Sequence, residues 1–254
     1  MTADAAILRL DAVGHNFGGL SVLRSVSFAV PERGLIGLIG PNGSGKTTLF
    51  NIITGFLAHQ RGTIFYRGRG LGTETVQDRS RAGMVRTFQT PKIFEHMSVL
   101  ENIMAGCCKL TRTAITEDLL RTPRARRQMA EIRRRAERAC VEFGLDRIRD
   151  LPALNLTAGQ RRILEIARAV VGEPQLLMLD EPSSGLNAEE IERLRGWMRQ
   201  LRQDGMSILL VSHDMELMAV ADDVHVLYFG EIIASGSMET IKQNARVREV
   251  YLGV

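Results

Sequence analysis

The chain has 254 residues, of which 44% are hydrophobic and 24% charged, and its formal net charge is +4 at pH 7. This balance excludes a disordered chain, which lacks the apolar residues for a core, and it fits one large domain or two lobes. No stretch approaches the about 18 uninterrupted apolar residues of a membrane-spanning helix, and the first residues lack the basic and apolar segments of a signal peptide.

The first third of the chain is predicted to form mainly strands. Apolar and polar residues alternate over 7–13 and 26–30, and residues 34–40 form a continuous apolar run that is typical of a buried parallel strand. Residues 46–56 are predicted to form a helix that begins at a glycine-rich turn. Residues 62–68 are predicted to form a short strand bounded by glycines.

The middle of the chain, over 98–156, has a helical composition and is interrupted by Pro123. Apolar residues over 124–143 recur at near-helical spacing, which predicts an inserted all-helical lobe. Between Arg121 and Arg138 the chain has eight arginines, against only two acidic residues. Such a run fits the exposed face of an ordinary helix, and it also fits a surface for nucleic acid or for anionic headgroups.

The last hundred residues alternate between helices and strands. Helices are predicted over 159–171 and 188–203, each followed by an apolar strand, at 176–179 and 207–211. Two short strands, at 224–229 and 232–234, precede a helical tail. This alternation predicts an α/β fold with a parallel sheet.

Residues 40–48 form the sharpest local motif, because they fit the pattern G-x-x-x-x-G-K-[ST] between an apolar strand and a helix. Glycines let successive backbone N–H groups turn inward around an anion, and the following helix directs its positive end at the same point. The lysine supplies a charge for the β- and γ-phosphates, and the next hydroxyl suits Mg²⁺. The nucleotide-binding candidates are therefore Gly40, Pro41, Asn42, Gly43, Ser44, Gly45, Lys46, Thr47 and Thr48.

A second motif is the apolar strand at 176–179, which runs into Asp180 and Glu181. Its end lies at the carboxyl edge of the sheet, where ligands bind in α/β folds. Asp180 would hold Mg²⁺ through water, and Glu181 would polarise the attacking water. By themselves, two adjacent acids after a strand also fit a solvated turn.

A third motif lies between the first two, where the short polar turn at 156–160 caps a long helix. Thr157 or Gly159 near a helix N-terminus suits an anion, although the turn alone is also an ordinary N-cap. Its sequence is close to L-S-G-G-Q.

These motifs, in this order, resemble those of the ATP-binding subunits of ABC transporters. More positions match the family's pattern: Phe17, where an aromatic ring stacks on adenine; Gln89, where the Q-loop glutamine binds Mg²⁺ and the attacking water; the D-loop at 184–187; and His213, the switch histidine that contacts the γ-phosphate. The resemblance extends over 7–253. For Phe17, packing in the core is the competing interpretation.

Within this family the chain is most similar to the larger ATPase subunit of branched-chain amino acid importers, a subfamily that also serves urea, short amides and aromatic acids. The matching segments are 17–19, 51–56, 85–89, 97–102, the basic run, 185–187 and the ending at 250–253. The resemblance implies a P-loop NTPase fold with a RecA-like core, an N-terminal antiparallel β-subdomain and an inserted helical subdomain. It implies a single nucleotide-binding domain over 1–254, with the core and β-subdomain at 1–90 and 157–254 and the helical subdomain at 91–156.

The resemblance also implies an ATPase that works as a dimer around two ATP molecules, with Mg²⁺ at each site. Thr47, Gln89 and Asp180 would serve the metal, Glu181 would be the catalytic base, and the opposing subunit would supply Thr157, Gly159 and Gln160. The implied partners are a second ABC ATPase (a copy of this chain or a different one), two transmembrane permease subunits and, indirectly, a solute-binding protein. No nucleic acid is expected, and the implied location is the cytoplasm, peripheral on the inner face of the cell membrane.

Two residues depart from the family's pattern. Ala158 stands where most members have glycine, and a positive φ there would cost about 1 kcal/mol. Asn187 replaces the usual D-loop aspartate, which keeps an acceptor and removes a charge.

Two other functions are compatible with these motifs. One is an ABC ATPase of a soluble or nucleic-acid-linked assembly, for which the basic run is the best support. The other is a structural module with a dead site, against which Lys46, Asp180, Glu181 and His213 argue.

Overall fold

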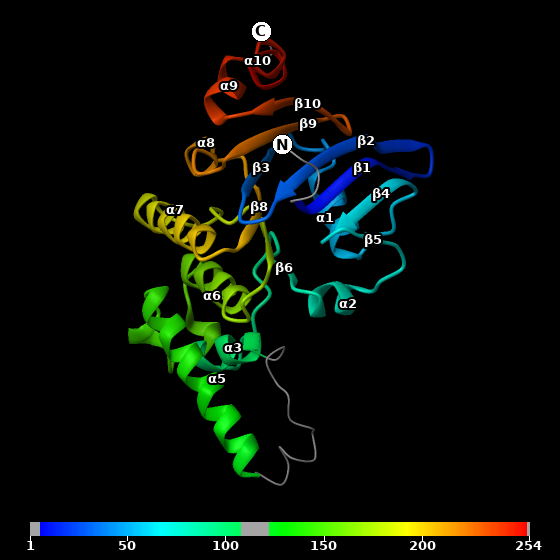
Figure 1. The fold of residues 1–254 in the computed structure, drawn as a ribbon. Helices are drawn as coiled ribbons and strands as arrows, with labels where there is room; N and C mark the ends of the chain where they lie inside the picture. The colour runs from blue at the N-terminus through cyan, green and yellow to red at the C-terminus, as the bar shows by residue number, and fades with distance from the viewer. Residues whose placement is uncertain (1–5, 108–121, 253–254) are drawn as a thin grey trace. The chain divides into compact units, whose positions relative to one another are not determined.

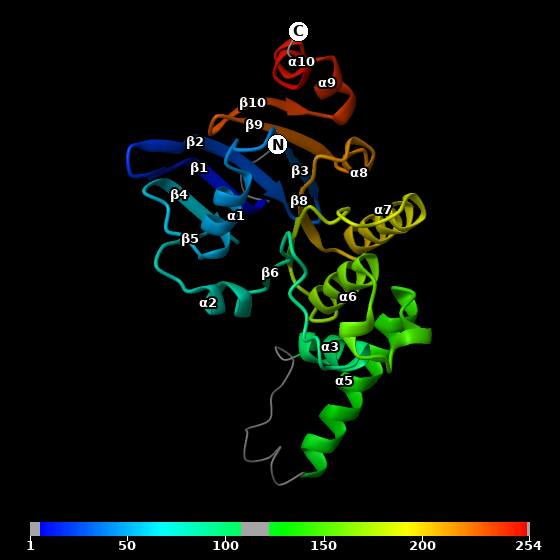
Figure 2. The ribbon, with the colours of Figure 1, turned by 180° about the vertical axis from the view of Figure 1, so that it is seen from behind.

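The computed structural model describes residues 6–107 and 122–252, and it divides into two compact units. Unit 1 comprises residues 1–86, 175–183 and 188–254, and unit 2 comprises residues 87–174 and 184–187. Arg121 and Gly253, which the sequence analysis used, lie outside the described residues. Figures 1 and 2 show the elements of both units from opposite sides.

Unit 1 contains an antiparallel sheet in the strand order β2-β1-β4-β5. Its strands are β1 (Ala6–Phe17), β2 (Leu20–Pro31), β4 (Arg61–Tyr66) and β5 (Arg69–Leu71). β1 and β2 form a long hairpin in which Phe17 pairs with Leu20, so Phe17 lies at the tip.

The second sheet of unit 1 has the order β10-β9-β3-β8-β7-β6, in which only β10 runs antiparallel to its neighbour. Its strands are β3 (Leu35–Ile39), β6 (Met84–Arg86), β7 (Leu176–Asp180), β8 (Ser207–Val211), β9 (Asp223–Tyr228) and β10 (Glu231–Gly236). Every residue of β3, β7 and β8 is buried, as the continuous apolar runs predict.

The helices of unit 1 are α1 (Lys46–Thr54), α2 (Val76–Arg81), α7 (Ala188–Gln203), α8 (Met215–Met218), α9 (Met238–Gln243) and α10 (Ala245–Leu252). α1 begins directly after the turn that follows β3, and it ends at Gly55, whose φ of 85° reverses the chain. Leu49, Phe50, Ile52 and Ile53 are fully buried in a core cluster that draws on both sheets. Burial of such a side chain stabilises the fold by about 1.5–3 kcal/mol, so α1 is held firmly behind its N-terminus.

Unit 2 is helical. It contains α3 (Val99–Gly106), α5 (Pro123–Glu142) and α6 (Ala158–Val170), together with the short 3₁₀ helices η3 (Asp146–Ile148) and η4 (Ala153–Asn155). α3 packs against both α5 and α6 (Figure 1). A Cβ on Gly106 would lie 2.2 Å from the carbonyl oxygen of Arg168, so α3 and α6 touch at their backbones there.

Helix α6 and residues 87–97 belong to unit 2. α6 packs against α3, and its side chains hydrogen-bond the backbone of residues 88–92.

The described arginines of the basic run lie along α5, where several pair with acidic residues. Arg134 and Arg135 bind Glu131 at 2.6 and 3.2 Å, and Arg133 binds Glu137 at 3.0 Å. These pairs follow the i, i+3 and i, i+4 spacing of a solvated helix face, which favours the simplest of the three interpretations of this run. Among the described residues, the structure has no helix with the length and apolar character that a bilayer span requires.

His225 of β9 generates a test of the packing of unit 1. Its ring is buried, lies 5.0 Å from that of Phe28 and hydrogen-bonds Ser235 Oγ at 2.7 Å. Burial lowers the pKa of His225, and the charge of Asp223 opposes this shift. The unfolded chain therefore takes up a proton at a pH where the folded chain does not, so the free energy of unfolding falls as pH decreases through about 6.5.

We expect His225→Gln to reduce this loss by at most about 1.4 kcal/mol per pH unit. Urea denaturation of the wild-type protein and the variant between about pH 7.5 and 5.5 measures how their free energies of unfolding depend on pH. The same slope in both proteins would contradict a buried neutral His225.

Candidate functional site

The loop over 40–48 joins β3 to α1 with the backbone that an anion site needs. Gly43 and Gly45 have φ angles of 79° and 108°, and Gly45 caps α1 without a side-chain hydrogen bond. A Cβ on Gly45 would lie 2.7 Å from Leu23 Cδ2, and one on Gly40 would lie 2.2 Å from the carbonyl oxygen of Leu227. Glycine is therefore required at both positions by packing, and at Gly45 by its φ angle as well.

Side chains of the loop also suit a phosphate. The Ser44 hydroxyl is buried and has no hydrogen-bond partner among the described residues. Lys46 Nζ donates to the carbonyl oxygens of Gly40 and Pro41, at 2.7 and 3.0 Å. The ammonium is therefore held over the loop. Burial lowers the pKa of Lys46, while the charges of Glu181 and Asp180 oppose this shift.

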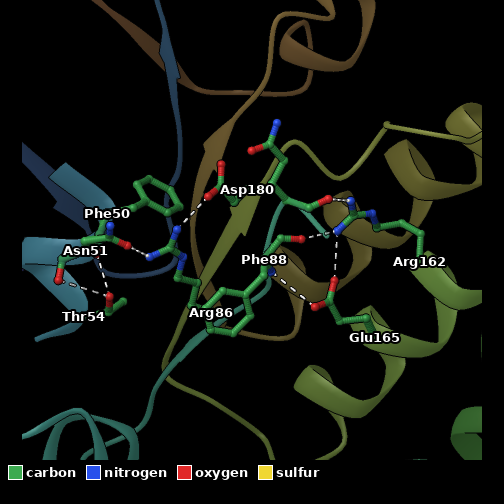
Figure 3. Close-up of polar contacts among 9 residues, drawn as sticks. Phe50, Asn51, Thr54, Arg86, Phe88, Arg162, Glu165 and Asp180 are labelled. Atoms are coloured by element: carbon green, nitrogen blue, oxygen red, sulfur yellow. Dashed lines mark hydrogen bonds and ion pairs between the residues drawn. The ribbon is translucent and has the colours of Figure 1, made fainter. Parts of the chain in front are cut away.

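Asp180 lies at the end of β7 and is buried in an ion pair with Arg86 of β6, with 2.7 Å between Oδ2 and Nη2 (Figure 3). The same guanidinium donates to Asn51 Oδ1 at 2.6 Å and lies 5.3 Å from the Phe50 ring centre. Arg86 thus connects the strand that bears Asp180 to the helix that begins at the phosphate loop.

Glu181 follows Asp180 in a left-handed conformation, with φ of 49°, and its N–H donates to the carbonyl oxygen of Val211. Its carboxylate Oε2 lies 2.8 Å from His213 Nδ1 and also accepts from the His213 N–H at 3.3 Å. The Glu181 side chain is largely buried, whereas the His213 side chain is 76% exposed. Left-handed backbone at a non-glycine residue is strained, and such strain clusters at functional sites.

The donors at this edge of the sheet fit Mg²⁺. Hydroxyl and carboxylate oxygens, here those of Thr47 and Asp180, are its preferred ligands, and the remaining positions are usually filled by waters and substrate phosphates. The Asp180 carboxylate is buried, and its Oδ2 is paired with the Arg86 guanidinium.

Phe17, at the tip of the β1–β2 hairpin, is 48% exposed, and its ring meets that of His15 edge-on at 4.6 Å. A core-packing role for Phe17 is therefore wrong. Its exposed ring is of the kind on which a flat base can stack.

The other predicted residues belong to unit 2. Thr157 caps α6: its hydroxyl accepts from the Gln160 N–H at 3.2 Å, and Gln160 Oε1 accepts from the Thr157 N–H at 3.0 Å. Gly159 is buried in the first turn. Ala158 is the first residue of α6 with a helical backbone, so the cost expected for a positive φ does not arise.

Gln89 is exposed, and its carbonyl oxygen accepts a hydrogen bond from Arg162 Nη2. Residues 184–187 of the D-loop also lie in this unit, where Gly185 has a φ of 82°. The structure therefore brings the phosphate loop, Asp180, Glu181 and His213 together in unit 1, and places Gln89, Thr157, Gly159 and Gln160 in unit 2.

Comparisons with known proteins identify the family of this chain. Residues 23–184, more than half of the chain, match the family model described as ABC transporter. A branched-chain amino acid transport ATP-binding protein of Salmonella typhimurium, LivG, is 40% identical over 97% of this chain and 98% of its own length. The chain belongs to the ABC transporter ATP-binding family. Coupling ATP hydrolysis to transport is the role of this family.

A second relative, a second family model and a solved structure also match this chain. The BraF protein of Pseudomonas aeruginosa, also named for high-affinity branched-chain amino acid transport, is 36% identical over 97% of this chain and 98% of its own length. Residues 231–254 match a model described as branched-chain amino acid ATP-binding cassette transporter. Among solved structures, the ADP conformation of an ABC transporter cassette superposes with a TM-score of 0.83, at 28% identity, over 98% of this chain and 99% of that one.

Sequence reasoning missed three residues with buried side chains that bind a predicted site residue or the segment of Gln89: Arg86, Arg162 and Glu165. Arg86 directly precedes the segment of Gln89, and the other two lie on the helix after Thr157, but nothing in their local spacing indicates burial. Arg162 and Glu165 pair one turn apart on α6, but their backbone partners and the side-chain partners of Arg86 are distant in sequence.

The Arg86–Asp180 pair generates a stability test. We expect Arg86→Met to destabilise the fold by about 3–5 kcal/mol, because it breaks a buried ion pair by removing one of its two partners. Chemical denaturation measures this loss. Arg81→Met is the matched control, since Arg81 is 80% exposed and 3.9 Å from Asp78. Equal stability of the two variants would contradict a structural role for the buried pair.

Proposed function

We propose that this ABC ATPase is the ATP-hydrolysing subunit of an importer for branched-chain amino acids or related small polar solutes. The match of residues 231–254 to the branched-chain model carries this proposal, because those residues lie outside the general family match. Two relatives named for branched-chain amino acid transport, similar over nearly the full length, support it.

In this proposal the phosphate loop holds the triphosphate. Backbone N–H groups of 40–48 and the N-terminus of α1 surround the phosphates, and Lys46 moves from the loop carbonyls to the β- and γ-phosphates. Phe17 stacks on the adenine with its exposed ring. Thr47 and Asp180 hold Mg²⁺, which balances the phosphate charge when bound.

Glu181 acts as the base on the attacking water, and His213 orients it and contacts the γ-phosphate. The 2.8 Å contact between Glu181 and His213 supports this pairing, because a base must be held in one orientation to accept a proton efficiently. The strained backbone of Glu181 and its hydrogen bond to Val211 fix the carboxylate at the end of β7.

The remaining residues complete the site from two sources. Gln89 of the same chain reaches Mg²⁺ and the attacking water, and Thr157, Gly159 and Gln160 of an opposing ATPase subunit contact the γ-phosphate. ATP drives association because it binds the closed dimer better than the open one, and this difference is the free energy available to move a partner.

The partners in this proposal are a second ABC ATPase, which is a copy of this chain or a different one, and two transmembrane permease subunits. A solute-binding protein delivers the solute to them. Our chain then lies at the inner face of the cell membrane, attached through the permeases.

We expect Glu181→Gln to lower the rate of ATP hydrolysis by about 10²–10⁴-fold, because the amide cannot accept the proton of the attacking water. Steady-state phosphate release measures the rate, and calorimetry measures ATP affinity, which should be unchanged. Lys46→Ala is the contrasting variant and should weaken ATP binding itself. Turnover of Glu181→Gln at the wild-type rate would remove Glu181 from the role of base.

The transporter assignment is tested in the native organism. A tagged chain purified from detergent-solubilised membranes should bring down two polytopic membrane proteins and a second ATPase, identified by mass spectrometry. A strain lacking the chain should lose uptake of labelled leucine, isoleucine and valine, and the wild-type gene should restore it where the Lys46→Ala gene does not. Recovery of soluble partners or nucleic acid alone would contradict the importer, and loss of urea uptake alone would change the solute class.

A further inference from the structure

A buried ion pair on α6 lies outside all the roles assigned so far. Arg162 and Glu165 are 1% and 3% exposed, one turn apart on the helix, with 2.9 Å between Nη1 and Oε2 (Figure 3). Arg162 is among the largest fully buried side chains of the described residues.

Both side chains bind the backbone of the segment that carries Gln89. Glu165 Oε1 accepts from the N–H groups of Phe88 and Lys92, at 3.2 and 3.0 Å. Arg162 Nη1 donates to the carbonyl oxygen of Phe88 at 2.5 Å, and Nη2 donates to that of Gln89. Figure 3 shows these contacts converging on Phe88 from α6. The backbone is thereby held on both sides of the Gln89 side chain.

Fold stability alone does not account for such a pair. Burial raises the pKa of Glu165, and the Lys92 N–H and Arg162 oppose this shift, so keeping the pair in the interior carries a desolvation cost. Apolar residues of similar volume usually serve stability as well or better. The pair instead fixes the orientation of the bound backbone, because a guanidinium fork and a carboxylate bind a backbone in a single arrangement.

The pair lies on the same helix as the turn that is proposed to contact the opposing subunit's nucleotide. Thr157, Gly159 and Gln160 lie in the N-terminal turn of this helix, directly before Arg162. In the proposed dimer this turn contacts the nucleotide held by the opposing subunit, whereas Gln89 serves the chain's own nucleotide. Helix α6 would thus connect the turn that contacts the opposing nucleotide to the segment that carries Gln89.

We propose that Arg162 and Glu165 are positioning residues that hold Gln89 in register with the N-terminal turn of α6, so that closure on one nucleotide sets the glutamine at the other. This inference rests on the proposed function, because it takes the roles of Gln89 and of the α6 turn from it.

The test uses the full-length chain with its second ATPase where they co-purify, and the variants Arg162→Lys and Glu165→Gln. Lysine keeps the charge and loses the fork, and glutamine keeps the shape and loses the charge. We expect either change to lower kcat by about 10–100-fold, as loss of a group that orients a metal-site residue does, and to raise the Mg²⁺ concentration for half-maximal turnover. The KM for ATP should be unchanged, because the phosphate loop is untouched. Arg135→Lys is the matched control, since Arg135 binds Glu131 and Glu173 at the surface of the same unit.

Double variants test whether Arg162 and Glu165 act through Gln89. Combined with Gln89→Ala, neither variant should lower kcat further, because residues acting as one unit are not additive. Additive losses would overturn the proposal, and so would a Gln89→Ala variant with wild-type turnover.

Amide hydrogen exchange separates this proposal from the proposed function. Exchange at residues 88–92 should be faster in both variants than in Arg135→Lys, whether or not the wild-type chain hydrolyses ATP. Unchanged exchange there would overturn the positioning role. A wild-type chain that binds no ATP would instead contradict the proposed function.

Discussion

The ion pair between Arg86 and Asp180 is the interaction on which the arrangement of unit 1 depends. Asp180 ends a fully buried strand, where a carboxylate needs a hydrogen-bonding partner of opposite charge. Arg86 supplies that partner and at the same time binds Asn51 on α1. The carboxylate, the strand that presents it and the helix that begins at the phosphate loop are therefore tied together by one side chain. Because α1 is also anchored by its apolar face, its N-terminus is held relative to the end of β7.

The same short stretch of chain enters a second buried pair in unit 2. Arg86 belongs to β6, and only a few residues later the backbone of 88–92 is bound by Arg162 and Glu165. Each pair uses an arginine whose planar fork binds two partners in fixed directions, which the rotating donors of a lysine do not impose. The chain that carries Gln89 thus follows one buried ion pair in unit 1, and its backbone is bound by another in unit 2. An exposed loop side chain such as that of Gln89 gains from such support, because a surface loop buries little area of its own.

The features that sequence reasoning predicted well are those that local patterns specify. The apolar runs of β3, β7 and β8, the glycines of the phosphate loop and the capping turn of Thr157 and Gln160 are each written in a few consecutive residues. The strands β5 and β6 and the helix α2 were missed, since they are too short for periodicity to reveal. Arg86, Arg162 and Glu165 could not be found, because a buried charge is identified only by partners that folding brings to it. The membership of α6 in unit 2 depends on the same tertiary contacts.

The arginines of α5 and the single Arg162 of α6 show why the effect of a charge depends on its burial. The arginines of α5 dominate the composition of the middle segment, yet the pairs they form there are solvent-exposed and of the kind that contributes little to stability. Arg162 is one arginine among many, and it is buried with all its effect concentrated on one stretch of backbone. Solvent screens the first set, so substitution on α5 changes mainly surface charge. The contacts of Arg162 are buried, and they reach the carbonyl oxygens of both Phe88 and Gln89.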